Sequence, residues 1–304
     1  MTDTKSSGLD VFAFPGSESA ANALARNLQA PLHPITVHRF PDEEALVTLP
    51  DRHDADTAVI VCSLDRPDAK LAALLFAADQ ARCQGINRLG LVAPYLAYMR
   101  QDKRFHAGEA ISSRTFASVL SHHFDFLVTV DPHLHRYSTL DEVFTIPSSV
   151  VSAAPAVAEW IAAKVERPLL IGPDSESAQW IEATAKLIDA PSCVLQKTRR
   201  GDADVSVSIP DIAAYRSHTP VLLDDIISTG RTMAAAVRQL VGAGGPAPVC
   251  IGVHAIFADD AYRMLCASGG GATVTCNTIV HVSNEIDVMP LVAAAIRALE
   301  QDQS

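Results

Sequence analysis

The sequence has no long apolar run and no excess of positive charge. Its longest aliphatic stretch, LAALLFAA at 71–78, is far shorter than the roughly 20 residues that a helix needs to cross a bilayer. Lysine and arginine number 24 against 35 acidic residues, and the formal net charge of -11 argues against a nucleic-acid or membrane-surface binder. A polyphosphate ligand stays open, because a local basic cluster can outweigh the global sign.

Cysteines are few, and the six in the chain are scattered without any C-x-x-C pair. Such spacing favours free thiols in a cytoplasmic protein over a disulfide framework. The first ten residues lack a basic segment followed by an apolar one, so we expect no signal peptide. Apolar residues, by contrast, are plentiful: 48% of the chain is hydrophobic and 19% charged, enough for the core of two ordinary domains or one large one.

Short apolar runs alternate with helix-like segments almost throughout the chain. In the first half these runs are VFAF (11–14), AVIVCSL (58–64), LGLVAPY (89–95) and FLVTVD (126–131). In the second half they are PLLIGPD (168–174), CVLQK (193–197), PVLLDD (220–225) and PVCIGVHAIF (248–257). Continuous apolar strands between helices predict mainly parallel sheets that are covered on both faces. We place one domain at 1–147 and another at 148–284; the amphipathic segment 285–304 could pack on either and is assigned to the first.

Polar residues gather where the predicted strands end. RQDKR follows residue 95, DPHLH follows 130, GPDSES follows 171 and DDIISTG follows 223. Parallel sheets of this class bind ligands beyond the carboxyl ends of their strands. The sequence therefore predicts that binding residues lie in these four segments.

The segment LLDDIISTGRTM (222–233) has the features of a sugar-phosphate site. Gly230 permits backbone conformations that other residues resist, and the N–H groups of Ser228–Thr232 would lie at a helix N-terminus, which attracts phosphate. The carboxylates of Asp224 and Asp225 suit ribose hydroxyls or a divalent cation. The alternative is a strand, turn and capped helix, which does not need two adjacent acids. A Walker loop is excluded because the glycine–lysine–Ser/Thr ending is missing.

Two further segments carry cations that suit a polyphosphate. APYLAYMRQDKRFHAGEAIS (93–112) contains a basic cluster of Arg100, Lys103 and Arg104. Arginine can grip phosphate oxygens with two N–H groups at once. QKTRRGDADVSVSIPD (196–211) is predicted to form a hairpin in which Lys197 and Arg199 share one face, so that it could close over a polyphosphate. A solvated positive loop is the alternative for both segments.

Two other segments have weaker patterns. HRFPDEEALVTLP (38–50) reads as a hairpin, in which Phe40 could stack a base while the acids accept from an exocyclic amine; a simple acidic turn is the alternative. VTVDPHLHRY (128–137) sets Asp131, His133 and His135 at a D-x-H-x-H spacing that could hold a metal. Structural histidines are the alternative reading of this second pattern.

In order and spacing, RFPDEE, PYLAYMRQDKRFHAGEAIS, TVDPH, KTR and LLDDIISTGRT resemble the motifs of ribose-phosphate pyrophosphokinases, also called phosphoribosyl pyrophosphate synthetases. The resemblance runs from about residue 9 to about residue 300. The last motif resembles a ribose 5-phosphate loop shared with type I phosphoribosyltransferases, whereas P-Y-x-x-Y-x-R-Q-D is specific to the synthetases. The resemblance implies an α/β fold of two similar phosphoribosyltransferase-type, Rossmann-like domains, each with a mainly parallel sheet flanked by helices, and an active site at their junction.

The resemblance also implies a reaction. Such an enzyme transfers the pyrophosphoryl group of ATP to the anomeric hydroxyl of ribose 5-phosphate, giving phosphoribosyl pyrophosphate and AMP for nucleotide biosynthesis. It implies ATP and ribose 5-phosphate as partners, magnesium as cofactor, self-association as a dimer or larger, and a cytoplasmic location. This transfer depends on in-line positioning and charge neutralisation more than on covalent help, and magnesium and a cationic lid supply both.

The family's functional residues carry over to this chain motif by motif. The resemblance assigns ATP binding to a hairpin from a neighbouring subunit and to the R-Q-D segment: Phe40, Asp42, Glu44, Arg100 and Gln101. It assigns magnesium contacts to His133 and Asp174. Ribose 5-phosphate binding falls to Asp224, Asp225, Ser228, Thr229, Gly230 and Thr232. Catalytic contact with the transferring group falls to Lys197 and Arg199.

Four departures from the family's pattern mark the chain as a divergent member. Glu43 stands where the family usually has glycine, and Arg231 replaces a glycine of the phosphate loop. Ser228 stands where many members have aspartate. Ser175-Glu176-Ser177 replaces a glycine-rich run, which puts ribose and metal contacts there in doubt.

Other functions remain open at this point. A phosphoribosyltransferase would need no ATP site, so RFPDEE and RQDK would have no purpose in it. A non-catalytic regulatory homologue would not need Lys197 and Arg199. A metal-dependent hydrolase built on His133 and His135 is a more distant alternative.

Overall fold

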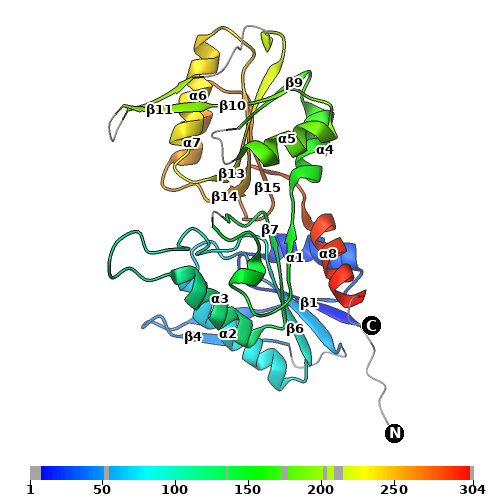
Figure 1. Cartoon of the computed structure of the whole chain (residues 1–304). Coiled ribbons are helices and arrows are strands. Elements are labelled where there is room, and N and C mark those ends of the chain that lie inside the picture. Colours follow the sequence, from blue (N-terminus) through cyan, green and yellow to red (C-terminus); the bar gives the residue numbers. More distant parts are fainter. Residues whose placement is uncertain are drawn as a thin grey trace. The chain divides into compact units, whose positions relative to one another are not determined.

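The computed structural model of the chain describes residues 8–50, 55–134, 136–172, 177–200, 204–208 and 215–301, with only the backbone for 179, 196–200 and 204–208. It divides into two compact units (Figure 1). The first comprises Met1–Ser152, Thr278–Val280 and Met289–Ser304, and the second Ala153–Asn277 and His281–Val288. Among the described residues, no helix combines the length and the apolar character that crossing a bilayer requires.

The first unit is built on a six-stranded parallel sheet in the order β2-β1-β5-β6-β7-β8. Its strands are β1 (Leu9–Ala13), β2 (Leu32–Pro34), β5 (Thr57–Val61), β6 (Arg88–Ala93), β7 (Phe126–Val130) and β8 (Ser148–Val151). The four predicted apolar runs became β1, β5, β6 and β7, which are buried almost throughout. The edge strands β2 and β8 were not predicted because they are short and partly exposed, so they carry no continuous apolar run.

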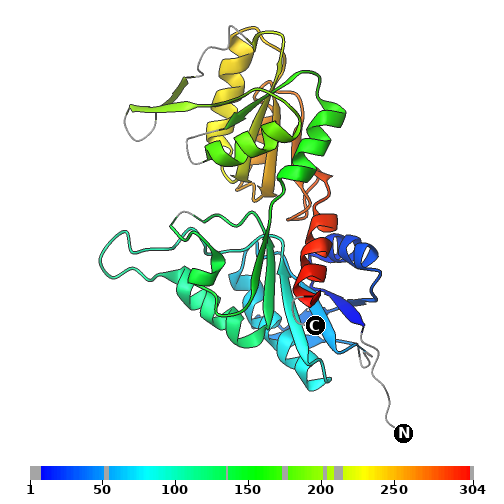
Figure 2. The same cartoon turned by 45° about the vertical axis from the view of Figure 1, so that its right-hand side comes forward.

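Helices cover both faces of this sheet (Figure 2). On one face lie α1 (Glu18–Leu28) and α8 (Met289–Gln301), which contact each other. On the other lie α2 (Asp68–Cys83), α3 (Ser112–His123) and a short 3-10 turn, η1 (Leu140–Glu142). The helix α8 buries Met289, Val292 and Ile296 at helical spacing, so the end of the chain packs against the first unit.

A glycine and an aromatic ring interlock in the centre of this sheet. A Cβ atom added to Gly90 in β6 would lie 2.1 Å from the ring of Phe126 in β7. The guanidinium carbon of Arg88 lies 4.6 Å from the centroid of the same ring, and its Nη2 donates to the carbonyl of Leu299 in α8, 3.1 Å away. Because Gly90 has no side chain, there is room for the Phe126 ring. Arg88 lies over that ring and bonds to the terminal helix.

The second unit has its own six-stranded parallel sheet, in the order β10-β9-β13-β14-β15-β16. Its strands are β9 (Pro168–Gly172), β10 (Ser192–Val194), β13 (Thr219–Ile227), β14 (Val249–Ala255), β15 (Thr273–Cys276) and β16 (Asn284–Ile286). The helices α4 (Ala154–Lys164) and α5 (Ala178–Leu187) pack together on one face. The helices α6 (Arg231–Gly242) and α7 (Ala261–Cys266) pack together on the other (Figure 2).

The two sheets share one topology. In each, the second strand of the series lies at the edge beside the first, and the third lies on the other side of the first. An antiparallel hairpin is inserted between the second and third strands: β3–β4 (Thr36–Arg39, Ala45–Thr48) and β11–β12 (Gln196–Arg200, Asp204–Ser208). Both hairpins were predicted, and the family resemblance implies two similar domains although the sequence has no literal repeat. The strand order reverses between β1 and β5 and between β9 and β13, where such sheets bind ligands.

Three boundaries differ from the prediction. The units separate after Ser152 rather than after residue 147, because β8 pairs in parallel with β7. The run 193–197 is divided between β10 and β11, which belong to different sheets. The strand β13 continues to Ile227 instead of ending at residue 225, and it pairs with β14 over that extension.

Candidate active site

The acidic pair of the second unit lies within the last part of β13. Asp224 and Asp225 are half-buried, and the amide of Asp225 donates to Oδ1 of Asp224 at 3.0 Å. Because the strand runs on to Ile227, these carboxylates stand before its end, and Ser228 and Thr229 form the loop that leads to α6. The structure thus places all of the predicted ribose 5-phosphate residues on one strand–loop–helix unit.

Gly230 shapes this loop. It is the N-cap of α6 in the left-handed conformation, with φ 64. The nearest described atoms would lie 3.7 Å from an added Cβ, so the backbone conformation, and not crowding, calls for glycine here. No side chain in the described part of the chain caps α6. Uncapped N–H groups beside the hydroxyls of Ser228 and Thr229 form an arrangement suited to phosphate.

The departure at position 231 does not disturb the loop. Arg231 is the first residue of α6, is exposed, and is not among the residues with positive φ. An arginine therefore fits the backbone at this position without strain. Its cation stands one residue from Gly230, where it adds positive charge beside the predicted phosphate loop.

The loop that follows β14 is hydrogen-bonded to the end of β13 and to the loop before α6. The amide of Phe257 donates to the carbonyl of Ile227 at 2.9 Å, and the amide of Ala258 donates to the carbonyl of Ser228 at 3.1 Å. Phe257 has φ 32, a conformation that turns the chain directly after β14. Sequence reasoning missed this support because bonds between backbone groups leave no mark on residue types.

The predicted catalytic residues lie in the hairpin of the second unit. Lys197 and Arg199 are in β11, in register with Val207 and Val205 of β12. The hairpin extends from the body of its unit, and β12 contacts α6 (Figure 1). The side chains of this hairpin are outside the described part of the structure, as is the predicted metal ligand Asp174.

In the first unit, the hairpin β3–β4 presents its predicted ATP residues on the surface. Phe40 is 43% exposed, and Asp42 and Glu44 are also exposed. The turn closes through two backbone bonds of 2.9 Å, from Phe40 N to the Glu44 carbonyl and from Glu43 N to the Phe40 carbonyl. Glu43 has φ 70, so the position where the family usually has glycine requires a left-handed backbone.

Both predicted ATP segments are anchored on the first turn of α2. Arg39, next to Phe40, donates from Nη1 to the Glu43 carbonyl at 2.9 Å and from Nη2 to the carbonyl of Ala69. Tyr98, two residues before Arg100, is hydrogen-bonded through its phenol to the carboxylate of Asp68. The adjacent residues 68 and 69 thus tie the hairpin and the R-Q-D segment to one helix.

Gln101 is held by the start of α3. Its carbonyl accepts from the amide of Ser113 at 3.3 Å, and its Oε1 accepts from the hydroxyl of Ser112 at 3.1 Å. Arg100 and Gln101 are both exposed.

Further along, Glu109 accepts from the amide of Phe105 at 2.8 Å. Hydrogen bonds from His106 to Glu109 lower the pKa of that carboxyl.

The predicted metal ligands do not form a complete site among the described residues. His133 is half-buried in the loop after β7, and His135 is outside the described residues. In the described part of the chain, no cluster of three or more His, Cys, Asp or Glu side chains could hold a metal alone. Magnesium in phosphoryl-transfer enzymes is held by one or two carboxylates together with substrate phosphates. Asp224 and Asp225 of the second unit fit that pattern.

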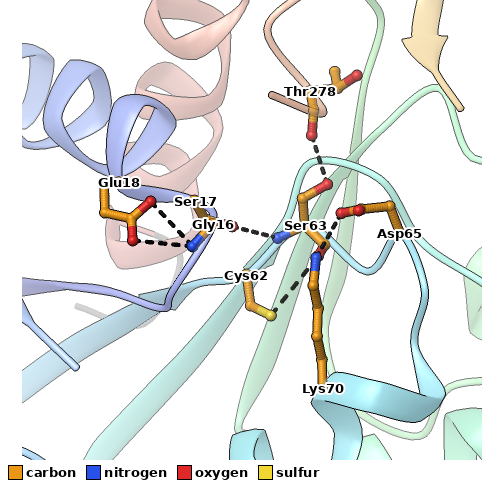
Figure 3. A network of polar contacts seen from close by, with 8 residues as sticks. All are labelled: Gly16, Ser17, Glu18, Cys62, Ser63, Asp65, Lys70 and Thr278. Carbon is orange, nitrogen blue, oxygen red and sulfur yellow. Dashed lines mark hydrogen bonds and ion pairs between the residues drawn. The ribbon is translucent and has the colours of Figure 1, made fainter. Parts of the chain in front are cut away.

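In the first unit, the segments that follow β1 and β5 are hydrogen-bonded to the protein's own groups (Figure 3). Both carboxylate oxygens of Glu18 accept from the amide of Gly16 at 3.0 Å, so an acid already serves the start of α1. The amide of Ser63 donates to Oγ of Ser17 at 2.9 Å, and Oγ of Ser63 donates to the carbonyl of Thr278 at 2.6 Å. The start of α1 thus differs from that of α6, which no side chain caps in the described part of the chain.

The thiol in this network is not a nucleophile. Cys62 is buried, and burial raises its pKa to about 12, so it stays protonated near neutral pH. Cys250 in β14 is buried as well, and its pKa is also raised to about 12.

Lys70 bonds to Oδ1 of Asp65 at 2.6 Å and to the carbonyl of Ser63 at 2.7 Å, which fixes the loop after β5.

Comparison with known proteins identifies the family. Residues 9–123 match the family model for the N-terminal domain of ribose phosphate pyrophosphokinase, and residues 141–268 match that for the phosphoribosyl transferase domain. The ribose-phosphate pyrophosphokinase of Methanopyrus kandleri is 34% identical over 279 residues, which cover 91% of this chain and 94% of that one. The chain belongs to the ribose-phosphate pyrophosphokinase family. The enzyme of that name from Halobacterium salinarum is 33% identical over 285 residues, or 92% of this chain and 98% of that one.

A solved structure of the same family supports the fold. Phosphoribosylpyrophosphate synthetase from Mycobacterium smegmatis superposes with a TM-score of 0.81 at 25% identity, covering 97% of this chain and 99% of that one. The predicted family and the predicted fold of two phosphoribosyltransferase-type domains are confirmed.

Proposed function

We propose that the protein is a ribose-phosphate pyrophosphokinase that uses ATP and ribose 5-phosphate to make phosphoribosyl pyrophosphate and AMP. One observation carries the proposal: a sugar-phosphate loop with left-handed Gly230 in the second unit occurs together with an anchored R-Q-D segment in the first. A phosphoribosyltransferase would need the loop but not the segment. The names of the relatives that match nearly the whole chain support the same activity.

The residues of the second unit would bind and orient the sugar. The carboxylates of Asp224 and Asp225 accept hydrogen bonds from the ribose hydroxyls, while the loop Ser228–Thr232 takes the 5-phosphate with N–H and hydroxyl groups. Holding the ribose at both ends fixes the anomeric hydroxyl for in-line attack. The anomeric oxygen then bonds to the β-phosphorus of ATP and loses its proton. The bond from that phosphorus to the oxygen bridging the α-phosphorus breaks, and AMP leaves with this oxygen.

Lys197 and Arg199 would neutralise the group in transfer. Charge on the phosphoryl oxygens is the main obstacle in such a reaction, so two cations on one hairpin supply electrostatic stabilisation. Magnesium, when bound, neutralises phosphate oxygens of ATP. By resemblance, His133 and Asp174 would contact it, and the carboxylates of Asp224 and Asp225 have the chemistry that suits a divalent cation.

The exposed hairpin β3–β4 would bind adenine. Phe40 offers a ring for stacking, and Asp42 and Glu44 offer acceptors for the exocyclic amine. We propose that it serves the site of a neighbouring subunit in a dimer or larger assembly. Co-expression of Phe40→Ala with Lys197→Ala tests this: a mixed dimer would keep one intact site, so about a quarter of wild-type activity returns. If the hairpin serves its own subunit, no activity returns.

The test of the activity is an assay of ATP consumption with ribose 5-phosphate and magnesium. AMP is the expected nucleotide product, and Lys197→Ala should lose nearly all turnover while still binding ribose 5-phosphate by calorimetry. Lys164→Ala, at the exposed end of α4, is the matched control and should retain turnover. Consumption of phosphoribosyl pyrophosphate with a base, without any need for ATP, would instead indicate a phosphoribosyltransferase.

A further inference from the structure

Asp102 is a buried acid between two exposed residues, Gln101 and Lys103. Its side chain is 0% exposed, although it belongs to a polar, charged loop. Oδ1 lies 2.8 Å from Nη1 of Arg136, whereas the buried Oδ2 has no hydrogen-bond partner within the described residues. Burying a carboxylate with one oxygen unpaired is costly, so the position calls for an explanation beyond folding.

Arg136 and its neighbour Tyr137 hold both the side chain and the backbone of Asp102. The phenol of Tyr137 donates to the carbonyl of Asp102 at 3.5 Å and lies 3.1 Å from Oγ of Ser113 in α3. The guanidinium of Arg136 also stands 5.6 Å from the centroid of the Phe105 ring. An arginine between a carboxylate and an aromatic ring has few orientations left, so the contact has a defined geometry.

The pair joins two segments that are distant in the sequence. Asp102 directly follows Arg100 and Gln101, and Arg136 is in the loop after β7 that contains His133. The start of α3 holds Gln101 from the other side. The Asp102–Arg136 ion pair therefore links the R-Q-D segment to the histidine loop.

We propose that the Asp102–Arg136 pair is a positioning device for ATP. It sets Arg100 and Gln101 in register with His133, so that groups from two loops meet the same polyphosphate together. Asp102 itself is fully buried and does not touch the nucleotide. This inference rests on the proposed function, because it assigns a role within the ATP site of that enzyme.

A role through charge and a role through positioning predict opposite changes in ATP affinity when Asp102 is replaced. A carboxylate near a polyanion repels it, so an acid that acted only through its charge would weaken ATP binding, and Asp102→Asn would strengthen it. A positioning role gives the opposite result, because loss of the charge-assisted hydrogen bond loosens both loops. Ribose 5-phosphate binds to residues of the second unit, so its KM should not change.

The experiment measures KM for ATP, KM for ribose 5-phosphate, kcat and thermal unfolding for a set of variants. Asp102→Asn and Arg136→Gln each break the pair, their double variant tests coupling, and Arg136→Lys keeps the charge. Arg136 is 45% exposed, so Arg136→Gln should fold even if the buried Asp102 variant does not. The control is Asp125→Asn, which breaks a 2.6 Å ion pair with Arg82 at the start of β7, the opposite end of that strand from the histidine loop.

We expect KM for ATP to rise about tenfold in each single variant, and no further in the double variant. Arg136→Lys should recover part of this loss. Asp125→Asn should lower the unfolding temperature and leave both KM values unchanged. An unchanged or lower KM for ATP in Asp102→Asn and Arg136→Gln, with an active wild type, would overturn the positioning role. An inactive wild type would overturn the proposed function instead, so the two failures are distinct.

Discussion

The phenol of Tyr98 is hydrogen-bonded to the carboxylate of Asp68 at the start of α2. The next residue, Ala69, offers its carbonyl to Arg39 of the hairpin β3–β4. One helical turn therefore positions two segments that are separated by about fifty residues of intervening chain, both of which we assign to ATP. Movement of this turn would disturb both segments.

Removal of the Tyr98 hydroxyl should weaken ATP binding. Tyr98→Phe keeps the ring, which packs 4.9 Å from Phe116, but loses the bond to Asp68. We expect KM for ATP to rise by up to about tenfold, the size of one hydrogen bond to a charged group, and KM for ribose 5-phosphate to stay constant. Equal increases in both KM values would contradict the assignment.

The same bond should be visible in the titration of the phenol. The hydrogen bond to Asp68 raises the pKa of Tyr98 above 10.0, because the carboxylate accepts from the neutral form. The bond is therefore present at neutral pH and is lost as pH rises through the raised pKa. Absorbance of the phenolate, with Tyr98→Phe subtracted, should show this residue titrating at lower pH in Asp68→Asn than in the wild type.

Position 43 should favour glycine. Glu43 has φ 70, which costs a residue with a side chain about 1 kcal/mol relative to glycine. We expect Glu43→Gly to tighten the hairpin and raise the free energy of unfolding by up to about 1 kcal/mol. Glu43→Ala is the matched control, since it removes the charge but keeps the strain. If the alanine variant stabilises the protein as much, charge rather than backbone explains the effect.

The contact between Gly90 and Phe126 predicts a large loss of stability in a conservative variant. A methyl group at position 90 would overlap the ring at 2.1 Å, so Gly90→Ala should cost about 3 kcal/mol in the free energy of unfolding. Phe126→Leu in the same chain should recover part of that loss, because the smaller side chain leaves room. Gly242→Ala is the control: its added methyl group meets nothing within 4 Å and should be neutral or stabilising. Strictly additive effects at 90 and 126 would show that the two residues do not interact.

His281 should make stability depend on pH. Its ring lies 4.6 Å from that of Phe257 and 4.7 Å from that of Tyr262, and its Nδ1 accepts from the amide of Ser283 at 3.2 Å. Burial lowers its pKa below 6.5. The unfolded chain therefore binds the proton more readily, and stability falls as pH drops from 6.5 through the lowered pKa.

His281→Gln tests that dependence. Unfolding midpoints at roughly pH 8 and roughly pH 5 should differ more in the wild type than in the variant, because the variant lacks the proton uptake of this histidine on unfolding. If the wild type and His281→Gln lost the same stability on acidification, another group would cause the pH dependence.

The sequence predicted the elements with strong apolar or turn patterns. The buried strands, both hairpins and the terminal helix follow from runs and periodicities that local chemistry imposes. The strand β2, with Leu32 exposed, has no such pattern, because its position at the sheet edge is decided by pairing with β1. The shared topology of the two units is likewise a property of strand order, which residue types do not record.

The site was predictable to a similar extent. Motif resemblance located the loop at Gly230 and the hairpin at Phe40, and the structure adds the left-handed conformations of Gly230 and Glu43. The motif resemblance could not reveal that Asp102 is buried, since the neighbouring residues of RQDKR are polar and exposed. Its carboxylate pairs with Arg136, which lies 34 residues further along the chain.

The most direct test of the account is phosphorus NMR of the purified protein with ATP, ribose 5-phosphate and magnesium. We expect a new diphosphate on the anomeric carbon of ribose, appearing together with AMP in equal amounts. Production of ADP, or no reaction under varied magnesium and phosphate, would contradict it. In that case Arg231, the cation placed where the family has glycine, would be the first residue to change.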